Sequence, residues 1–593
     1  MLLDISNLTI ELLDPGCGEY VPVVRDFSLQ LPKGRIVGIT GRSGSGKSTL
    51  ARALNGTLPL SARVRISELR LLQTKVTPDV ETQYISAEEW NLQILSAYGG
   101  NGFSVQQDAQ SVLVPFRSVG WHFRQARRTG GGLTIRQMAR AAELSEAQLS
   151  AFPRQLNTGH CQRVQLMLAT QMRPKVLIAD EPFASLNPAA RHEFSDRITA
   201  LASKNSGIVL ISHDLDVLKR CCHDVLVMAN GRSAESGPAD HVFERPGHPQ
   251  TQTLLALSSN SAESCRVIRR QVTPDDTCCF ADVCHVHDKA ACAAPVPTAQ
   301  KWSDGRTVVC DRVSEYGQPV EPNNVDECEQ MPADRENPDN AVNVLQLTDV
   351  SRIFTDSSGP GLLRHLRGRT ENPLPPGLIN RSLALPARGR VCLRGRNGIG
   401  KTTLARIAVG LEESDSGEVL RLGQPDLTGN LDHIGRRRLW RQAQLVYQDS
   451  DVSFDPNQSV LDCIREVWEV EFSLSAEQCR NSASRLLAEF GLSDRLLDRT
   501  TVLLSGGERR RLSIARALAV FGFVTADEWL TERDEPRFVI LDEPTVGLDM
   551  VMQKVVIRVL KAAQIRRNLA YLVISHDDAF TDKFCEGQIQ EWT

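Results

Sequence analysis

The residues best suited to chemistry in this sequence form two copies of a phosphate-binding motif. The pattern G-x-x-x-x-G-K-S/T occurs at residues 41–48 and again at residues 395–402. In such a loop, glycines let backbone N–H groups turn toward a polyphosphate, the lysine reaches its β and γ oxygens, and the hydroxyl binds Mg²⁺. Apolar residues precede each copy and helix-forming residues follow it, which predicts strand, loop and helix in both halves. The predicted phosphate-contacting residues are Gly41, Ser43, Gly44, Gly46, Lys47, Ser48, Thr49, Gly395, Asn397, Gly398, Gly400, Lys401, Thr402 and Thr403, with Ser48 and Thr402 as Mg²⁺ ligands.

Each half also contains an apolar strand that ends in two carboxylates. Four apolar residues lead into Asp180 and Glu181, and four more lead into Asp542 and Glu543. A strand buried on both faces delivers its last side chains to the carboxyl edge of a parallel sheet, where ligands bind. There the aspartate can hold the Mg²⁺ water shell, and the glutamate can orient and deprotonate an attacking water. For one copy without its phosphate loop, a solvated Asp-Glu pair would be the better interpretation.

Two further motif pairs recur in the same order. Gln107 and Gln448 follow apolar strands and precede an acid, so each amide can reach Mg²⁺ or its water while the backbone hinges a neighbouring subdomain. His213 and His576 each lie in a Ser-His-Asp triplet after a strand, where an imidazole can contact a γ-phosphate. A lone glutamine is usually a loop amide, and a lone histidine is usually structural. Because four features match in one order, we interpret the sequence as an internal repeat.

Length and composition limit the possible folds. At 593 residues, with 41% hydrophobic and 24% charged residues, the chain suits two large globular domains and a connector. With a net charge of -4, the chain lacks the overall positive charge that is typical of nucleic-acid-binding proteins. The sequence has no apolar run of about 18 residues and no secretory leader pattern. We therefore expect the chain neither to span a membrane nor to be exported by that route.

The motifs resemble those of the ATP-binding cassette (ABC) family. The diagnostic signature of that family stands at residues 504–508 as Leu-Ser-Gly-Gly-Glu, and the matching segment of the first half is Leu-Asn-Thr-Gly-His at residues 156–160. The resemblance implies that two cassettes pair head to tail, with each ATP and its Mg²⁺ between the phosphate loop of one and the signature of the other. A helix N-terminus is a sensible cap for a γ-phosphate. The residues expected to contact nucleotide there are Ser505, Gly506, Gly507, Asn157 and Gly159.

The resemblance also predicts the fold class and the domains. We expect an α/β fold with two P-loop NTPase cassettes of ABC type, each a parallel-rich sheet with a helical subdomain. The first nucleotide-binding domain is expected at residues 1–260 and the second at residues 341–593. Residues 261–340 are rich in Ser, Asp, Asn, Pro and Cys, which is typical of a linker without a large core.

Residues 230–257 narrow the resemblance further. Their pattern of Asn-Gly-Arg, Glu-Ser-Gly-Pro, Val-Phe-Glu and His-Pro-Gln-Thr is similar to the tail of cassettes from oligopeptide, dipeptide, glutathione and nickel importers. The long opening segment of that subfamily is matched at residues 354–376. The resemblance implies an ATPase on the cytoplasmic side of the cell membrane, bound peripherally to two integral-membrane permease subunits and, through them, to an extracytoplasmic solute-binding protein.

A second class of function competes with the importer. Soluble twin-cassette ATPases act on ribosomes or DNA, and they share the doubled cassette. Their sequence signals are a charged helical linker, an N-terminal cysteine domain or zinc fingers inside a cassette. None of these signals is present in the sequence, so we expect no nucleic-acid partner.

The linker is unusually rich in cysteine. It contains seven of the fifteen cysteines, which are Cys265, Cys278, Cys279, Cys284, Cys292, Cys310 and Cys328. Clustered cysteines in a chain without a leader favour metal ligation over disulfides. Cys278, Cys284, Cys292 and Cys310 resemble the cysteine tail of the importer subfamily, whose members can carry an iron-sulfur cluster there. Four thiolates can hold a 4Fe-4S cluster or Zn²⁺, the spacing does not decide between them, and free thiols in a loose loop are the alternative.

The departures from the family pattern fall on one of the two expected ATP sites. The first site joins the intact signature to Lys47, Gln107, Glu181 and His213, and we expect it to hydrolyse ATP. The second joins the altered signature to Lys401, Gln448, Glu543 and His576. In the altered signature, Thr158 has a branched side chain at a position where glycine would allow close approach to phosphate. In addition, the first half has Asn187 where the second half has the acid Asp549. We expect the second site to bind ATP and turn over slowly; the alternative is that Asn157 and backbone groups substitute and both sites work.

Overall fold

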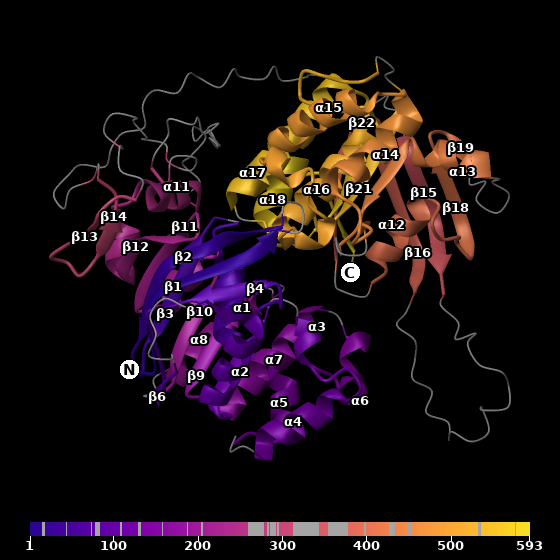
Figure 1. Ribbon diagram of the computed structural model, residues 1–593. Coiled ribbons are helices and arrows are strands. Elements are labelled where there is room, and N and C mark those ends of the chain that lie inside the picture. Colours follow the sequence, from indigo (N-terminus) through magenta and orange to yellow (C-terminus); the bar gives the residue numbers. More distant parts are fainter. Residues whose placement is uncertain are drawn as a thin grey trace. The chain divides into compact units, whose positions relative to one another are not determined.

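The computed structural model divides into two compact units near residue 330, and each unit is described by itself. The structure describes residues 1–592 except 15–17, 43, 73, 77–83, 107–108, 129–131, 157, 185, 187, 203–204, 259–277, 281–283, 285–291, 293–295, 312, 314–342, 354–376, 396–398, 426–432, 449–452, 532–534, 549 and 576. Both units combine an antiparallel sheet, a parallel sheet and a group of helices (Figure 1).

The first unit begins with a six-stranded antiparallel sheet. Its central strand β1 pairs with three neighbours, β2, β4 and β5. Side chains of β1 such as Leu3, Ile5 and Leu8 are buried in a core that also contains residues of α1 and α2. The strands are β1 (Leu3–Asp14), β2 (Glu19–Leu31), β4 (Ala62–Arg65), β5 (Glu68–Leu71), β6 (Thr74–Lys75) and β7 (Ile85–Ser86).

The second sheet of the first unit carries the predicted motifs at its strand ends. Its order is β13-β14-β12-β11-β3-β10-β9-β8, and the five strands from β11 to β8 run parallel. Along β9, Val176 and Ile178 enter one core while Leu177 and Ala179 enter another. Both faces are therefore covered, which explains the continuous apolar run in the sequence. The strands are β3 (Ile36–Gly41), β8 (Gly102–Val105), β9 (Val176–Asp180), β10 (Gly207–Ile211), β11 (Asp224–Ala229), β12 (Arg232–Pro238), β13 (Ala299–Lys301) and β14 (Thr307–Val309).

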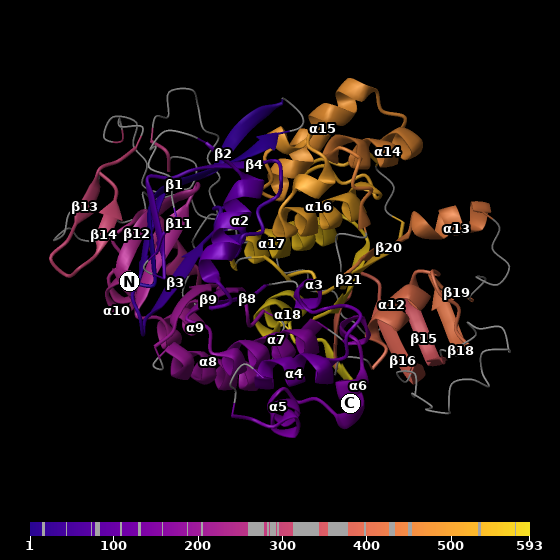
Figure 2. The same cartoon turned by 60° about the horizontal axis from the view of Figure 1, so that its bottom comes forward.

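Helices of the first unit cover the parallel sheet and form a separate group around α4 (Figure 2). Local signals place their starts: Thr134 with Gln137 and Ser145 with Gln148 form capping boxes at α5 and α6. The helices are α1 (Lys47–Asn55), α2 (Ala87–Tyr98), α3 (Ala109–Val112), α4 (Val119–Arg128), α5 (Ile135–Ala141), α6 (Glu146–Ser150), α7 (Thr158–Met172), α8 (Pro188–Ala202), α9 (Leu215–Cys221), α10 (Ala239–Glu244) and α11 (Pro249–Ser258).

Part of the predicted linker adds a hairpin to the edge of this sheet. β14 pairs antiparallel with β12, and β13 pairs with β14. A buried ion pair anchors the hairpin: Arg306 Nη1 lies 3.4 Å from Glu235 Oε1, with 4% and 0% of the two side chains exposed. The Glu235 carboxylate also accepts hydrogen bonds from the backbone N–H groups of Gly247 and His248, at 3.0 and 2.9 Å. The hairpin is therefore joined to the first unit by charge as well as by strand pairing.

This anchor gives a stability prediction. We expect Arg306→Met to lower the free energy of unfolding by about 3 kcal/mol, because it leaves a buried carboxylate without its cation. Chemical denaturation of the purified protein measures the loss. The double variant Glu235→Gln with Arg306→Met removes both charges and is expected to recover most of it. A single variant within about 0.5 kcal/mol of the parent, the range of an ordinary surface change, would contradict the anchor.

The second unit repeats the arrangement. Four strands form an antiparallel sheet in the order β16-β15-β18-β19, and five parallel strands follow the order β20-β21-β22-β17-β23. The phosphate-loop strand β17 again lies beside the strand that ends in the histidine motif, β22. The strands are β15 (Asn343–Arg352), β16 (Leu378–Pro386), β17 (Arg390–Gly395), β18 (Ser416–Arg421), β19 (Gln424–Pro425), β20 (Ala443–Val446), β21 (Arg537–Asp542), β22 (Leu569–Ile574) and β23 (Ile589–Trp592).

Helices complete the second unit, and the predicted fold class is confirmed in both halves. Ser459, Ser475 and Ser505 cap the starts of α14, α15 and α16 with their side chains. The helices are α12 (Lys401–Ala408), α13 (His433–Trp440), α14 (Val460–Phe472), α15 (Ala476–Glu489), α16 (Gly506–Ala519), α17 (Met550–Arg566) and α18 (Asp578–Cys585).

Candidate functional sites

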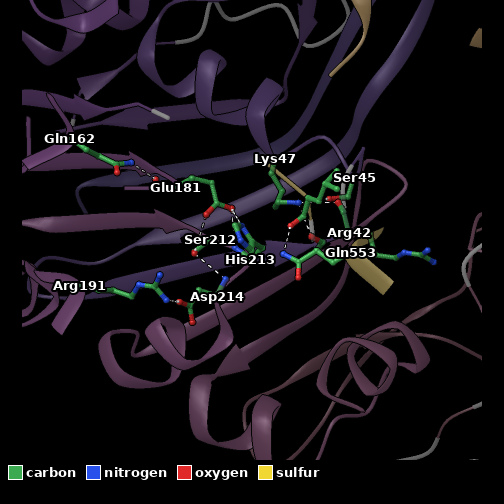
Figure 3. Close-up of polar contacts among 12 residues, drawn as sticks. Arg42, Ser45, Lys47, Gln162, Glu181, Arg191, Ser212, His213, Asp214 and Gln553 are labelled. Carbon is green, nitrogen blue, oxygen red and sulfur yellow. Dashed lines mark hydrogen bonds and ion pairs between the residues drawn. The ribbon is translucent and has the colours of Figure 1, made fainter. Parts of the chain in front are cut away.

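The first phosphate loop connects β3 to α1 with a backbone that requires glycine. Gly41 and Gly46 have φ values of 150° and 97°, and a Cβ on Gly41 would lie 2.2 Å from the carbonyl oxygen of Met228. Lys47 Nζ donates to the carbonyl oxygens of Gly41 and Arg42 at 2.7 and 2.9 Å (Figure 3). The ammonium group therefore lies over the loop, where the phosphates of a nucleotide would bind.

The carboxylate and histidine motifs of the first unit meet at one edge of the sheet. The Glu181 carboxylate accepts hydrogen bonds from Ser212 Oγ at 3.2 Å and from the backbone N–H of His213 at 2.9 Å. His213 Nδ1 lies 2.8 Å from Glu181 Oε1 (Figure 3). The Glu181 charge raises the pKa of His213 against the effect of burial. Burial opposes ionisation of Glu181, but the His213 and Lys47 charges and the hydrogen bonds outweigh it and lower the pKa of Glu181. The two side chains form an ion pair.

Asp180 is suited to a cation. Burial and the neighbouring Glu181 charge raise the pKa of the Asp180 carboxyl to about 7, although Lys47 and Arg52 oppose this. A bound Mg²⁺ would supply the positive charge that this carboxylate lacks. The predicted ligand Ser48 lies in the first turn of α1, directly after Lys47.

The second unit brings a hydroxyl and a carboxylate together at the same place. Thr402 Oγ1 donates to Asp542 Oδ2 at 2.9 Å, and Lys401 Nζ donates to the carbonyl oxygen of Gly395. Thr402 and Asp542 are thus adjacent, as two oxygen ligands of one Mg²⁺ must be. Burial raises the pKa of Asp542, while the Thr402 hydrogen bond and the Lys401 charge oppose it. Gly400, with φ 99°, caps the start of α12, whose first turn contains Thr403.

Glu543 has the same backbone and the same serine contact as Glu181. The φ values of Glu181 and Glu543 are 46° and 50°, a left-handed conformation that is uncommon for a residue with a side chain. Ser575 Oγ donates to Glu543 Oε2 at 3.3 Å, as Ser212 does to Glu181. Strained backbone that recurs at matching acids is a feature of functional sites. The sequence interpretation gave these serines no role, although their repetition in both Ser-His-Asp triplets was a signal.

The signature segment of the second unit begins a helix. Ser505 caps α16, and its backbone N–H and hydroxyl both donate to Glu508 Oε2, at 2.9 and 2.8 Å. Gly506 and Gly507 form the first turn, so their N–H groups stand at a helix N-terminus, as an anion site requires. In the first unit, the matching helix α7 begins at Thr158, and Gly159 lies in its first turn.

The structure places some predicted site residues together and leaves others outside its description. Lys47, Asp180, Glu181 and His213 follow three neighbouring strands of one sheet. In the second unit, Lys401 and Thr402 follow β17, while Asp542 and Glu543 stand at the end of β21, with β22 between these two strands. Gln448 follows β20 at the edge of that sheet. Ser43, Gln107, Asn157, Asn397, Gly398 and His576 lie outside the described residues. The roles assigned to all of these residues stay predictions.

A pocket beside the hairpin gathers the four predicted metal-binding cysteines. Cys278, Cys284, Cys292 and Cys310 line it together with His248 and Phe280. The rings of His248 and Phe280 meet edge to face at 4.9 Å. In the described part of the chain, no group of three or more His, Cys, Asp or Glu side chains is arranged so that it could hold a metal ion.

The protonation of His248 follows from its partner. The backbone N–H of Gln250 donates to His248 Nδ1 at 3.0 Å. A backbone amide can only donate, so Nδ1 is unprotonated and a neutral His248 ring carries its proton on Nε2. Such a ring is a hydrogen-bond donor at Nε2. The four thiols and the carboxylate of Asp311, which also lines the pocket, are then the candidate ligands.

Comparison with known proteins identifies the family. A model of the ABC transporter family matches residues 24–184 and 378–546, and each match runs from before a phosphate loop to beyond its strand-end carboxylates. The chain belongs to the ABC transporter family. With two nucleotide-binding cassettes, it is an ABC-type ATPase that uses ATP and Mg²⁺.

Nearly the whole chain is similar to ATP-binding proteins of glutathione import. Glutathione import ATP-binding protein GsiA of Salmonella paratyphi A (strain ATCC 9150 / SARB42) is 28% identical over 596 residues, which is 98% of this chain and 83% of that protein. GsiA of Escherichia coli (strain K12) is 27% identical over 610 residues, with the same coverage of 98% and 83%.

A solved structure shares the fold of the ABC chain at low sequence identity. A chain in a model of ribosome-bound archaeal Pelota and ABCE1 is similar over 93% of this chain and 72% of its own length, with a TM-score of 0.50 and 17% identity. Among the described residues of our chain, no helix combines the length and the apolar character needed to cross a membrane.

Proposed function

We propose that this ABC ATPase is the motor subunit of a bacterial-type importer for peptides or related small solutes, such as glutathione or metal chelates. The observation that carries the proposal is the similarity to glutathione import ATP-binding proteins over 98% of the chain, linker and tail included. ATP binding would close the two cassettes and hydrolysis would reopen them, while two separate membrane permeases follow the movement. The cytoplasmic, membrane-peripheral location follows from this role.

Two exposed apolar side chains that follow the predicted first glutamine loop in sequence support contact with a permease. Phe116 and Val114 are 79% and 44% exposed, and they lie nine and seven residues after Gln107 in the sequence. A large aromatic side chain left in water is a common feature of interaction sites. A matching apolar position on a permease would cover it and move with the glutamine loop.

This surface gives a binding prediction. We expect Phe116→Asp to reduce co-purification of permease proteins from detergent-solubilised membranes by about tenfold or more, because loss of one buried aromatic anchor costs about 2 kcal/mol. Leu60→Asp is the matched control, since Leu60 is 80% exposed and belongs to the loop after α1. Recovery of ribosomes or DNA by the parent in place of permeases would overturn the importer proposal. If both variants recover the same amount of permease, Phe116 is not part of the permease contact.

The Glu181–His213 ion pair supports a simple order of events at the first site. In this pair, the imidazole and the carboxylate neutralise each other. A γ-phosphate near His213 would compete for its charge, and a released Glu181 would accept a proton from the attacking water. ATP binding would thus free the catalytic base from its ion pair.

We propose further that the cassettes pair head to tail and that the two ATP sites are unequal. The intact signature helix, capped by Ser505, would complete the site of Lys47 and Glu181. The site of Lys401 and Glu543 would receive the first cassette's signature, in which Asn157 and Thr158 replace serine and glycine. A poorer cap stabilises transition-state charge less, so the second site would bind ATP and hydrolyse it slowly.

We also propose a metal centre in the cysteine pocket, built from Cys278, Cys284, Cys292 and Cys310. The four thiols line one pocket, and thiolates can hold either a 4Fe-4S cluster or Zn²⁺. The cluster is the first expectation because the cysteine pattern resembles that of importer cassettes that can carry one. Binding of either metal supplies folding free energy to a polar segment that has little core of its own. The thiols come from both sides of the β13–β14 hairpin in sequence, so the centre would join this segment to the first cassette.

A further inference from the structure

A buried arginine connects the signature helix of the second cassette to its glutamine loop. Arg510 lies on α16, and its side chain is 3% exposed. Its guanidinium donates to the carbonyl oxygens of both Tyr447 and Gln448. A guanidinium carries several donors in a fixed fork, so it can hold two successive carbonyls at once. The backbone from which the Gln448 side chain projects is therefore fixed by the helix that begins at the signature.

The first cassette has a different side chain at this position. Counting three residues from the second signature glycine leads to Arg510 from Gly507 and to Gln162 from Gly159. Gln162 is fully buried, and its amide donates to the carbonyl oxygen of Glu181 at 3.1 Å. The first cassette therefore has a neutral amide at the position where the second cassette has a buried cation.

Arg511 shows what a purely structural arginine does on the same helix. It is 1% exposed, and it donates to the carbonyl oxygens of Phe490 and Gly491, at 3.0 and 2.8 Å. Those carbonyls follow α15 in the helical subdomain, away from the predicted Mg²⁺ ligands. Arg511 Nε also donates to the carbonyl oxygen of Gly507 at 3.2 Å, and Gly507 is predicted to serve the other ATP site. Burial and carbonyl contacts are thus common to both arginines, whereas the contacts of Arg510 are to the glutamine loop of its own cassette.

We propose that Arg510 is a positioning residue that holds Gln448 at the Mg²⁺ of the second cassette through the main chain of the glutamine loop. The inference rests on the predicted role of Gln448 and is independent of the importer proposal. Loss of Arg510 would leave the phosphate loop intact and would weaken the metal-dependent part of nucleotide binding. Groups that orient metal ligands typically contribute about 10–100-fold to metal affinity or activity.

The test measures nucleotide binding by the second cassette alone. In a Lys47→Ala background, the dissociation constant of a fluorescent ATP analogue is measured with Mg²⁺ and with EDTA. We expect Arg510→Gln, which introduces the residue of the first cassette, to weaken Mg²⁺-dependent binding by about tenfold or more while binding in EDTA is unchanged. Arg510→Lys should recover part of the loss, since it restores the charge and one hydrogen bond.

Two controls separate positioning from folding. Arg511→Gln should lower the unfolding temperature and leave the ratio of the two dissociation constants as in the parent. Gln448→Ala should reproduce the loss seen with Arg510→Gln. An unchanged ratio in Arg510→Gln, or an equal loss in Arg511→Gln, would overturn the proposal; if Arg510→Gln does not fold, Arg510→Lys carries the same test with a smaller loss. If Gln448→Ala leaves the ratio of the two dissociation constants unchanged, Gln448 does not contribute to Mg²⁺-dependent binding. The proposed positioning role of Arg510 would then be wrong as well.

Discussion

Replacing Glu181 by Gln is expected to reduce steady-state ATP turnover by about a hundredfold or more, measured with the permeases present. The substitution keeps the size of the side chain and removes the base, and a positioned general base typically contributes about 10²–10⁴-fold. Ser212 and His213 hold Glu181 at the carboxyl edge of the sheet, and the neighbouring carboxylate of Asp180 is the predicted Mg²⁺ ligand.

The matching change in the second cassette is the internal control. Glu543→Gln is expected to leave most of the turnover, because its site receives the altered signature of the first half. The two acids share a left-handed backbone and a serine contact, so the comparison holds the local geometry constant. Equal losses in the two variants would show that both sites hydrolyse ATP. A larger loss in Glu543→Gln would show that the assignment of the sites is reversed.

Protein purified without oxygen is expected to contain iron and acid-labile sulfide in equal amounts, bound by the cysteine pocket. We expect Cys310→Ser to remove nearly all of the iron, because Cys310 is buried in the pocket and its neighbours Val308 and Trp302 hold the hairpin in place. Elemental analysis, sulfide determination and visible absorbance measure the loss. The changed protein should also be less stable, because metal binding contributes to folding.

A cysteine outside the pocket provides the matched control. Cys463 is equally buried but lies on α14 in the second unit, so Cys463→Ser should retain its iron. If the parent protein contains zinc and no iron, the centre is a zinc site with the same four ligands and not an iron-sulfur cluster. Absence of both metals, or full iron retention by Cys310→Ser, would contradict the metal centre as proposed.

The fold could be predicted from sequence because its determinants are local and repeated. The apolar run before Asp180 marks a strand covered on both faces, and the doubled order of motifs indicates that the two halves repeat one fold. Position 46 requires a glycine with positive φ before a helix, and the sequence shows that glycine directly.

Other features depend on contacts between segments that are distant in sequence. The Glu181–His213 ion pair needs the register between β9 and β10, which the motifs alone do not give. The β13–β14 hairpin consists of short, polar strands that become stable only beside β12 and the buried Glu235. The contact from Arg510 to Gln448 spans 62 residues, so no local pattern in the sequence marks it.

The most direct test of the proposed function compares two possible activators of ATP turnover. The purified ATPase is combined either with its permeases in liposomes and the cargo-loaded solute-binding protein, or with ribosomes or DNA. The importer account predicts that turnover rises with the loaded permease complex, that this rise disappears in Glu181→Gln, and that ribosomes and DNA have no effect. Stimulation by ribosomes or DNA without any response to the permease complex would contradict it.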